Sequence, residues 1–308
     1  MLTLTESQIR TLAGPEAVIN AIREAFTRDY SRTLHMPVRT CVELGEGGVL
    51  LVMPAYDSAI GFAGVKLVTV TRATGVNAAY ELIHGSSGAL LARMEANWLT
   101  DVRTAATSSL ATDLLARRDA ATLGIFGTGR QAFAHLAVLP RVRGFQRFLV
   151  CGSGRAEADG FQDRVKREQG IDVQLVGPEA CARESDVICT CTTSATPVFD
   201  GRWLRPGTHI NAVGAFQPGT REVDDTTVRR SRVVVDTYDG ALAEAGDLLI
   251  PLRSGAIARE HVAADLHEIA SGTRPGRTGS DQITLFKSVG CALEDLVTAQ
   301  LIWQRAMQ

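Results

Sequence analysis

Apolar residues recur with helical or alternating spacing up to about residue 120, and in short continuous runs after it. Residues 14–31 place Val18, Ile19, Ile22 and Phe26 at helical spacing and predict a helix. Two alternating stretches turn at "GEGG" and "GSSG" and predict two β-hairpins, with the strand "FAGVKLVTVT" between them. The stretch "NWLTDVRTAATSSLATDLLA" then predicts a long helix.

After residue 120, the apolar runs are separated by helical or turn segments. The runs are "TLGIFG", "FLVCG", "VQLVG", "DVICTCT", "HINAVG" and "RVVVDT". Continuous apolar strands of this kind are typical of parallel sheets that are covered on both faces. The chain is therefore predicted to be an α/β protein with a doubly wound parallel sheet, and it ends in a loop, a short strand and a last helix.

A glycine-rich turn, "GIFGTGRQAFAHL", follows the first of these runs. Gly127, Gly129 and Ala132 match the Gly-x-Gly-x-x-Gly/Ala pattern, in which the glycines permit a tight turn and a close approach of pyrophosphate. The amide groups at the start of the following helix then face the negative charge. This pattern predicts a dinucleotide site that includes Gly127, Thr128, Gly129, Arg130 and Gln131. Thr192 and Val213 are also predicted to bind the cofactor.

The residues after the second strand distinguish between the two nicotinamide cofactors. An acid there binds the ribose hydroxyls of NAD, whereas arginine and hydroxyl groups suit the extra phosphate of NADP. In "LVCGSGRAEAD" no acid follows the strand directly, and Ser153 and Arg155 occupy the turn. We therefore predict NADP(H) as the preferred cofactor; the alternative is NAD(H) bound by backbone contacts, with Arg155 in solvent.

Three cations in the first part of the chain are candidates for binding a substrate. Lys66 lies within an apolar strand, where a charge is costly unless it is paired or used. Arg103 lies early on the long helix beside small residues, and Arg39 precedes the first hairpin. Singly, each is more often a surface or ion-paired residue, but together they suit a small carboxylate.

Composition excludes several classes of function. The chain has 308 residues, 45% hydrophobic and 21% charged, with a net charge of −2. This charge gives no general attraction to nucleic acid or to an anionic membrane. No apolar run reaches the roughly 20 residues of a membrane span, and the start does not resemble a signal peptide, so we expect a cytoplasmic protein. Neither the six cysteines nor the six histidines have the spacing of a metal site, and none is expected.

Five motifs in order resemble the ornithine cyclodeaminase/mu-crystallin family: "GVKLVTV", "LTDVRTAATS", "GIFGTGRQA", "WLRPGTHINAVGA" with "REVDD", and "DQITLFKSVGCALED". The resemblance implies a Rossmann domain over residues 118–287. It also implies a substrate-binding and dimerisation domain made from residues 1–117 and 288–308, and hence a homodimer. In this family, the positions of Arg39 and Arg103 bind the substrate carboxylate, and that of Lys66 lies at the reacting atoms. Residues bordering the cofactor would be Thr107, Ser108, Ser288 and Gly290.

One departure from the family pattern bears on the reaction. Members that deaminate ornithine have an aspartate shortly after "NAVG", where this chain has Phe216. A phenyl ring cannot accept a proton. The alternative is that Phe216 only packs in the fold and another residue does the work of the acid. "GAFQP" resembles instead the cyclic-imine reductases of the family. This resemblance implies NAD(P)H-dependent reduction of Δ1-pyrroline-2-carboxylate or Δ1-piperideine-2-carboxylate to L-proline or L-pipecolate. It also implies that Lys66 is catalytic and that Phe216 lies beside the substrate.

Other activities remain open alternatives. They are an ornithine cyclodeaminase, an alanine or opine-type dehydrogenase, and a non-enzymatic, cofactor-binding crystallin-like protein.

Overall fold

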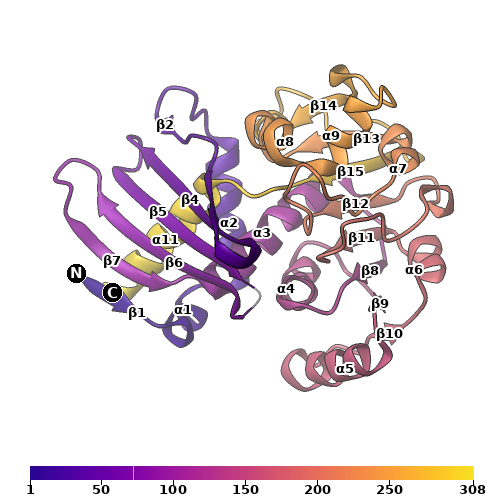
Figure 1. The fold of residues 1–308 in the computed structure, drawn as a ribbon, viewed down its shortest axis with the longest axis horizontal. Coiled ribbons are helices and arrows are strands. Elements are labelled where there is room, and N and C mark those ends of the chain that lie inside the picture. Colours follow the sequence, from indigo (N-terminus) through magenta and orange to yellow (C-terminus); the bar gives the residue numbers. More distant parts are fainter. Residues whose placement is uncertain (72) are drawn as a thin grey trace. The chain divides into compact units, whose positions relative to one another are not determined.

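The computed structural model describes residues 1–71 and 73–308, which divide into two compact units. Unit 1 contains Met1–Thr107 and Gly290–Gln308, and unit 2 contains Ser108–Val289. Both ends of the chain therefore contribute to unit 1, as predicted (Figure 1). The first boundary lies within the long helix α3 (Asn97–Leu115), at residue 107 rather than at the predicted residue 117.

Unit 1 is built on a seven-stranded sheet in the order β1-β7-β6-β5-β4-β2, with β3 paired to β4. Both predicted hairpins form, and their turns lie at the predicted glycine-rich sequences. Its strands are β1 (Leu2–Leu4), β2 (Leu34–His35), β3 (Thr40–Leu44), β4 (Gly48–Asp57), β5 (Phe62–Thr71), β6 (Gly75–His84) and β7 (Leu90–Glu95). Its other elements are α1 (Glu6–Leu12), α2 (Pro15–Thr27), the 3-10 turn Gly45–Gly47, the first part of α3, and α11 (Ala292–Ala306).

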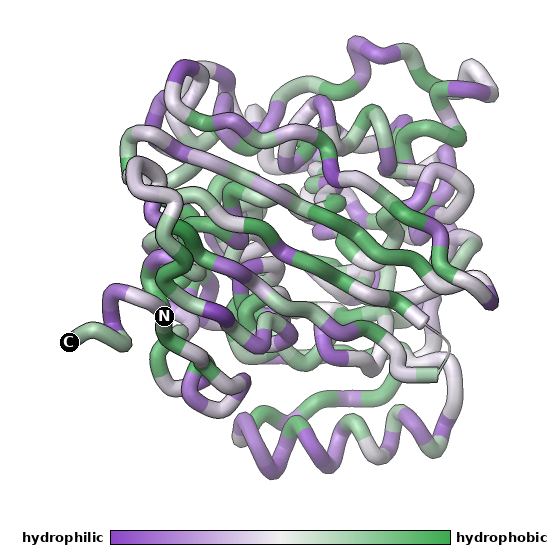
Figure 2. Tube along the Cα trace, turned by 60° about the vertical axis from the view of Figure 1, so that its left-hand side comes forward, coloured by the Kyte–Doolittle hydropathy of each residue, from purple (hydrophilic) through white to green (hydrophobic). Residues whose placement is uncertain are grey.

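The last helix, α11, packs on β4, β5 and β6 and against α2. Side chains of β5 alternate accordingly. Phe62, Lys66 and Val68 are buried, whereas Val65 and Leu67 on the opposite face are partly exposed. Figure 2 shows apolar and polar segments alternating along the strands of this sheet. The pattern places Lys66 on the face of the sheet that the helices of unit 1 cover.

Unit 2 contains an eight-stranded parallel sheet in the order β10-β9-β8-β11-β12-β15-β13-β14. All six predicted runs form strands, and the short strand predicted before the last helix is β15. The strands are β8 (Thr122–Phe126), β9 (Arg147–Cys151), β10 (Gln174–Leu175), β11 (Val187–Thr190), β12 (His209–Ala212), β13 (Ser231–Val235), β14 (Val262–Asp265) and β15 (Ile283–Lys287). The order reverses beside β8, and ligands bind at such a switch point at the carboxyl ends of the strands.

Short helices connect the strands of unit 2. They are α4 (Arg130–Val138), α5 (Arg155–Gln169), α6 (Pro178–Glu184), α7 (Asp225–Arg230), α8 (Tyr238–Glu244), α9 (Gly246–Arg253) and α10 (Leu266–Ala270), with 3-10 turns at Leu139–Arg141, Gly201–Trp203 and Arg259–His261. Every residue of β11 and β12 is buried, as expected for central parallel strands. Within residues 1–71 and 73–308, no helix combines the length and apolar character that a bilayer crossing requires.

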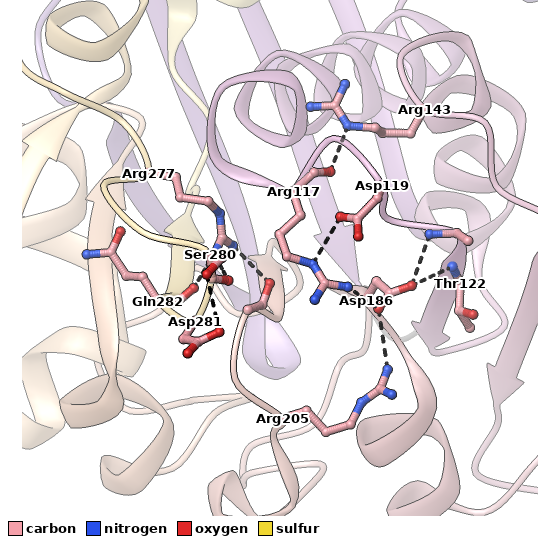
Figure 3. Close-up of polar contacts among 12 residues, drawn as sticks. Arg117, Asp119, Thr122, Arg143, Asp186, Arg205, Arg277, Ser280, Asp281 and Gln282 are labelled. Carbon is pink, nitrogen blue, oxygen red and sulfur yellow. Dashed lines mark hydrogen bonds and ion pairs between the residues drawn. The ribbon is translucent and has the colours of Figure 1, made fainter.

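The amino ends of the parallel strands are fixed by Asp186, which directly precedes β11 (Figure 3). Its carboxylate accepts hydrogen bonds from the amide groups of Ala121 and Thr122, each at 3.0 Å, and from Arg117 at 2.9 Å. Arg277 donates to the carbonyl of Gly207 at 3.0 Å. These contacts hold the end of the sheet opposite the one where a ligand is expected.

A buried ion pair lies beside the loop that follows β12. Lys287 Nζ is 2.8 Å from Asp247 Oδ2 and donates to the carbonyl of Ala215 at 2.5 Å. Asp247 also accepts hydrogen bonds from the amides of Glu222 and Val223. Both charged side chains are fully buried, so each depends on the other for compensation.

Replacing Lys287 by methionine should therefore destabilise the protein strongly. The substitution leaves Asp247 buried without its counter-charge, and such a loss costs about 3–5 kcal/mol. Urea denaturation measures the change in the free energy of unfolding. The matched control is Arg183→Ala, which breaks the exposed pair of Arg183 with Glu179 on α6 and should cost at most about 1 kcal/mol. Equal losses in the two variants would show that the buried pair is not stabilising.

Candidate active site

Two of the three predicted substrate-binding cations are buried together in unit 1. Lys66 comes from β5 and is 1% exposed, and Arg103 comes from α3 and is 5% exposed. Neither side chain is turned toward bulk solvent. Arg39 is partly buried and directly precedes β3, and its part in a substrate site stays a prediction.

Two acids on the last helix hold these cations. Asp295 Oδ1 lies 2.7 Å from Lys66 Nζ and 2.9 Å from Arg103 Nε. Glu294 Oε2 lies 2.6 Å from Arg103 Nη1. Both carboxylates are fully buried. The result is a buried four-charge cluster, defined here as Lys66, Arg103, Glu294 and Asp295, in which two cations face two anions.

Sequence analysis missed the two acids. Glu294 and Asp295 lie in the first turn of α11, where acidic residues are common because they interact favourably with the helix dipole. Their sequence position therefore gave no indication of burial. The available signal was their adjacency on a helix that is otherwise largely apolar.

Burial and the neighbouring charges shift the pKa values in this cluster. Burial lowers the pKa of Lys66 to about 8, and the positive charge of Arg103 acts in the same direction. The carboxylate of Asp295 opposes both effects. Burial would also lower the pKa of Arg103, but the two carboxylates raise it above its ordinary value. Arg103 is thus permanently charged, whereas Lys66 can exchange a proton close to neutral pH.

Gly290 allows the guanidinium of Arg103 to lie directly against the backbone. Its φ of +79° is in the left-handed region, and a Cβ atom there would lie 2.5 Å from Arg103 Nη1. The predicted cofactor residue Gly290 therefore also has a steric reason to be glycine. Thr107, another predicted cofactor residue, is buried and donates its hydroxyl hydrogen bond to the carbonyl of Arg103 at 2.9 Å.

The glycine turn of unit 2 has the shape that a dinucleotide requires. Gly127 has a φ of +111°, and a Cβ atom there would lie 2.6 Å from the carbonyl oxygen of Cys191. Gly129 is the N-cap of α4, and a Cβ atom there would meet nothing within 4 Å. The open space at Gly129 and the start of α4, where Arg130 is exposed and Gln131 is half-buried, fit a pyrophosphate. Ala132 is buried, which allows the close helix–strand packing that the pattern predicts.

The adenosine end of the predicted site contains an acid that the sequence analysis did not consider. Glu157, in the first turn of α5, accepts a hydrogen bond from Thr128 Oγ1 at 2.5 Å and one from Ser153 Oγ at 3.5 Å. Arg155 is the first residue of α5, is largely exposed and pairs with Asp159. The helix thus brings a carboxylate back to the glycine turn, although none follows the strand directly.

Other predicted cofactor residues are held by buried acids of unit 2. Glu222 Oε1 accepts hydrogen bonds from the amide and the hydroxyl of Thr192, both at 2.7 Å. Burial raises the pKa of Glu222, and Lys287 opposes this shift. Ser288 donates to Asp236 Oδ2 at 2.9 Å. Val213 and Phe216 are half-buried on the loop that follows β12, and Phe216 packs against the apolar core of unit 2.

Comparisons with known proteins identify relatives of this chain. The profile of the ornithine cyclodeaminase/mu-crystallin family matches residues 1–308. A Δ1-pyrroline-2-carboxylate reductase of Bacillus cereus is 32% identical, over 100% of this chain and 97% of the relative.

Two solved structures are also similar. One is Thermococcus litoralis Δ1-pyrroline-2-carboxylate reductase with NADH and L-proline, with a TM-score of 0.96 and 37% identity over 100% of this chain and 98% of that one. The other is an archaeal alanine dehydrogenase dimer with bound NAD, with a TM-score of 0.93 and 31% identity over 100% and 96% of the two chains. The chain belongs to the ornithine cyclodeaminase/mu-crystallin family.

Proposed function

We propose that this chain reduces the C=N bond of a cyclic ketimine carboxylate, Δ1-pyrroline-2-carboxylate or Δ1-piperideine-2-carboxylate, to L-proline or L-pipecolate. At the coarser level, it is an oxidoreductase that acts on C=N or CH–NH bonds with a nicotinamide cofactor. The observation that carries the proposal is the buried four-charge cluster. Lys66 and Arg103 are both held inside the protein, where burying a charge is costly even when it is paired.

The two cations have different tasks in this reaction. Arg103 stays charged and presents a planar guanidinium that suits a carboxylate, so it would fix the orientation of the substrate, with Arg39 as its predicted partner. Lys66 would lie at the reacting C=N bond, and bound NAD(P)H supplies the hydride. Correct orientation of reacting groups lowers the barrier by several kcal/mol, about 7–11 at most.

Phe216 supports reduction rather than deamination. Cyclodeamination of ornithine needs a group that accepts protons beside the substrate amine, and the ring of Phe216 cannot do so. An apolar ring suits a cyclic substrate that carries a single carboxylate. The Bacillus and Thermococcus relatives are named for this same class of reaction.

For the cofactor, we propose NADP(H) as the preferred form, with NAD(H) also used. Ser153 and Arg155 at the turn after β9 suit the extra phosphate of NADP. Glu157, which contacts Thr128 and Ser153, opposes a second negative charge there. Two of the similar structures contain NADH or NAD. Opposing charges at this turn predict a modest preference rather than an exclusive one.

We also propose that the chain forms a homodimer through the sheet of unit 1. The face opposite α11 presents Val52 and Pro54 on β4, which pair with Leu67 and Val65 on β5. Val52, Pro54 and Val65 are partly buried, and Leu67 is 38% exposed. Contiguous apolar patches of this kind mark protein interfaces. A second copy is the occupant that the archaeal alanine dehydrogenase dimer supports.

A substrate panel tests the proposed reaction. The purified protein should oxidise NADPH or NADH when five- or six-membered cyclic ketimine carboxylates are added, as followed by the absorbance of the reduced nicotinamide. It should not do so with pyruvate and ammonia, and it should release no ammonia from ornithine. Turnover of pyruvate and ammonia, with no turnover of the cyclic imines, would establish a dehydrogenase. Release of ammonia from ornithine without net oxidation of the cofactor would establish a cyclodeaminase. A protein that binds the cofactor but turns over none of these substrates would be a binding protein.

Replacing Arg155 by alanine tests the cofactor proposal. Because a charge-assisted hydrogen bond contributes about 1.5–3 kcal/mol, the KM for NADPH should rise about tenfold or more, with little change for NADH. Arg167→Ala, at the other end of α5, is the control and should affect neither cofactor. A parallel change in both KM values would mean that Arg155 does not recognise the phosphate.

Replacing Leu67 by glutamate tests the dimer. A charge at the centre of an apolar interface is costly to bury, so the variant should elute as a monomer in size-exclusion chromatography with light scattering. Met307→Glu introduces the same charge at an exposed apolar residue near the end of the chain and should leave the dimer intact. A dimeric Leu67→Glu variant would place the interface elsewhere.

A further inference from the structure

We infer that Asp295 is a positioning residue of this reaction, which holds Lys66 beside Arg103 and keeps it an ammonium group that donates its proton to the imine nitrogen. The inference rests on the proposed reduction of a C=N bond. It assigns the origin of the proton, which the family resemblance and the proposed function leave open.

The proton balance of the step defines what Lys66 must do. The ring carbon of the ketimine takes the hydride from NAD(P)H, and the π electron pair of the C=N bond moves to nitrogen. The nitrogen takes a proton from Lys66 Nζ, so that one N–H bond breaks and another forms. The products are the cyclic amine, NAD(P)+ and a neutral Lys66, which water reprotonates. A lysine that is neutral before the step cannot supply this proton.

The geometry singles out Asp295 as the group that controls this lysine. One carboxylate oxygen, Oδ1, is 2.7 Å from Lys66 Nζ and 2.9 Å from Arg103 Nε. The same atom therefore fixes the two cations relative to each other. Asp295 is fully buried, so the attraction is weakly screened by solvent.

The groups that face Lys66 lie on β4, β6, α3 and α11. On β6, Tyr80 is paired opposite Lys66, and burial and the Asp295 charge raise the pKa of this phenol well above its ordinary value. On β4, the residue opposite is the uncharged Met53. Arg103 on α3 disfavours the ammonium form, and Glu294 on α11 favours it less strongly than Asp295 does. Asp295 is thus the group that most strongly counteracts the lowering of the Lys66 pKa by burial and by Arg103.

The resulting pKa of Lys66, about 8, suits a proton donor near neutral pH. Asp295 raises this pKa, so removing its charge must lower it, and the ammonium form is then lost at a lower pH. At pH values well below the new pKa, Lys66 stays charged in both proteins, and the difference in activity should be smallest there.

Glu294 provides a matched control on the same turn of α11. It lies 2.6 Å from Arg103 Nη1, and its effect on the pKa of Lys66 ranks below that of Asp295. Glu294→Gln should therefore act mainly through the orientation of Arg103, by raising the KM for the imine about tenfold. Its pH profile should shift much less than that of Asp295→Asn.

The experiment measures kcat and kcat/KM for cyclic imine reduction across the pH range that brackets the pKa of Lys66, in the wild type, Asp295→Asn and Glu294→Gln. In a plot of rate against pH, the limb on which activity falls with rising pH should lie about 1–3 pH units lower in Asp295→Asn than in the wild type. An alkaline limb that stays in place, or one that moves equally in both variants, would overturn the role of Asp295. Absence of imine turnover in the wild type would instead overturn the proposed function.

Lys66→Arg keeps the test decisive if Asp295→Asn does not fold. Arginine preserves the ion pair with Asp295 but does not release a proton in this range. We expect kcat to fall about 100-fold or more and the alkaline limb to disappear. A Lys66→Arg variant that keeps the wild-type limb, or retains wild-type kcat, would show that Lys66 is not the donor.

Discussion

Compensation of buried charge by buried charge is the constraint on which the structure depends. In unit 1, the acids of α11 neutralise Lys66 and Arg103, and in unit 2, Asp247 neutralises Lys287. A charge inside a protein persists only if a counter-charge is held close to it. The last helix therefore has to pack against β5 and α3, which explains why the end of the chain returns to the unit formed by its beginning.

The same compensation affects recognition of the substrate. The buried four-charge cluster has two cations and two carboxylates, so in the proposed reaction a substrate carboxylate would meet a guanidinium that already has two partners. Binding would then depend on the remaining donors of Arg103 and on their fixed direction more than on net attraction. Such a site favours a small, flat acid of defined shape over any anion that happens to be present.

Most of the fold could be predicted because it follows from local pattern. The hairpin turns, the long helix and the parallel strands all have the periodicity of their type, and the glycine turn has a specific spacing. β1, β2 and β14 were missed because these short strands do not lie in continuous apolar runs such as those that predicted β11 and β12.

The site was only partly predictable, because its main contacts join distant positions. Lys66 and Asp295 are 229 residues apart, and no local pattern links them. Glu157 was missed because an acid was sought directly after β9, whereas the first turn of α5 brings it back to Thr128. The role of Arg39 stays a prediction.

The late position of α11 has a consequence for synthesis on the ribosome. Unit 2 is continuous in sequence, so it can fold as soon as its last strand has emerged. The sheet that carries Lys66 precedes unit 2 in the sequence, and the counter-charges on α11 follow unit 2, so the ribosome makes them only after the whole of unit 2. Until α11 has emerged, the ammonium group of Lys66 and the guanidinium group of Arg103 lack the carboxylates that neutralise them in the folded protein.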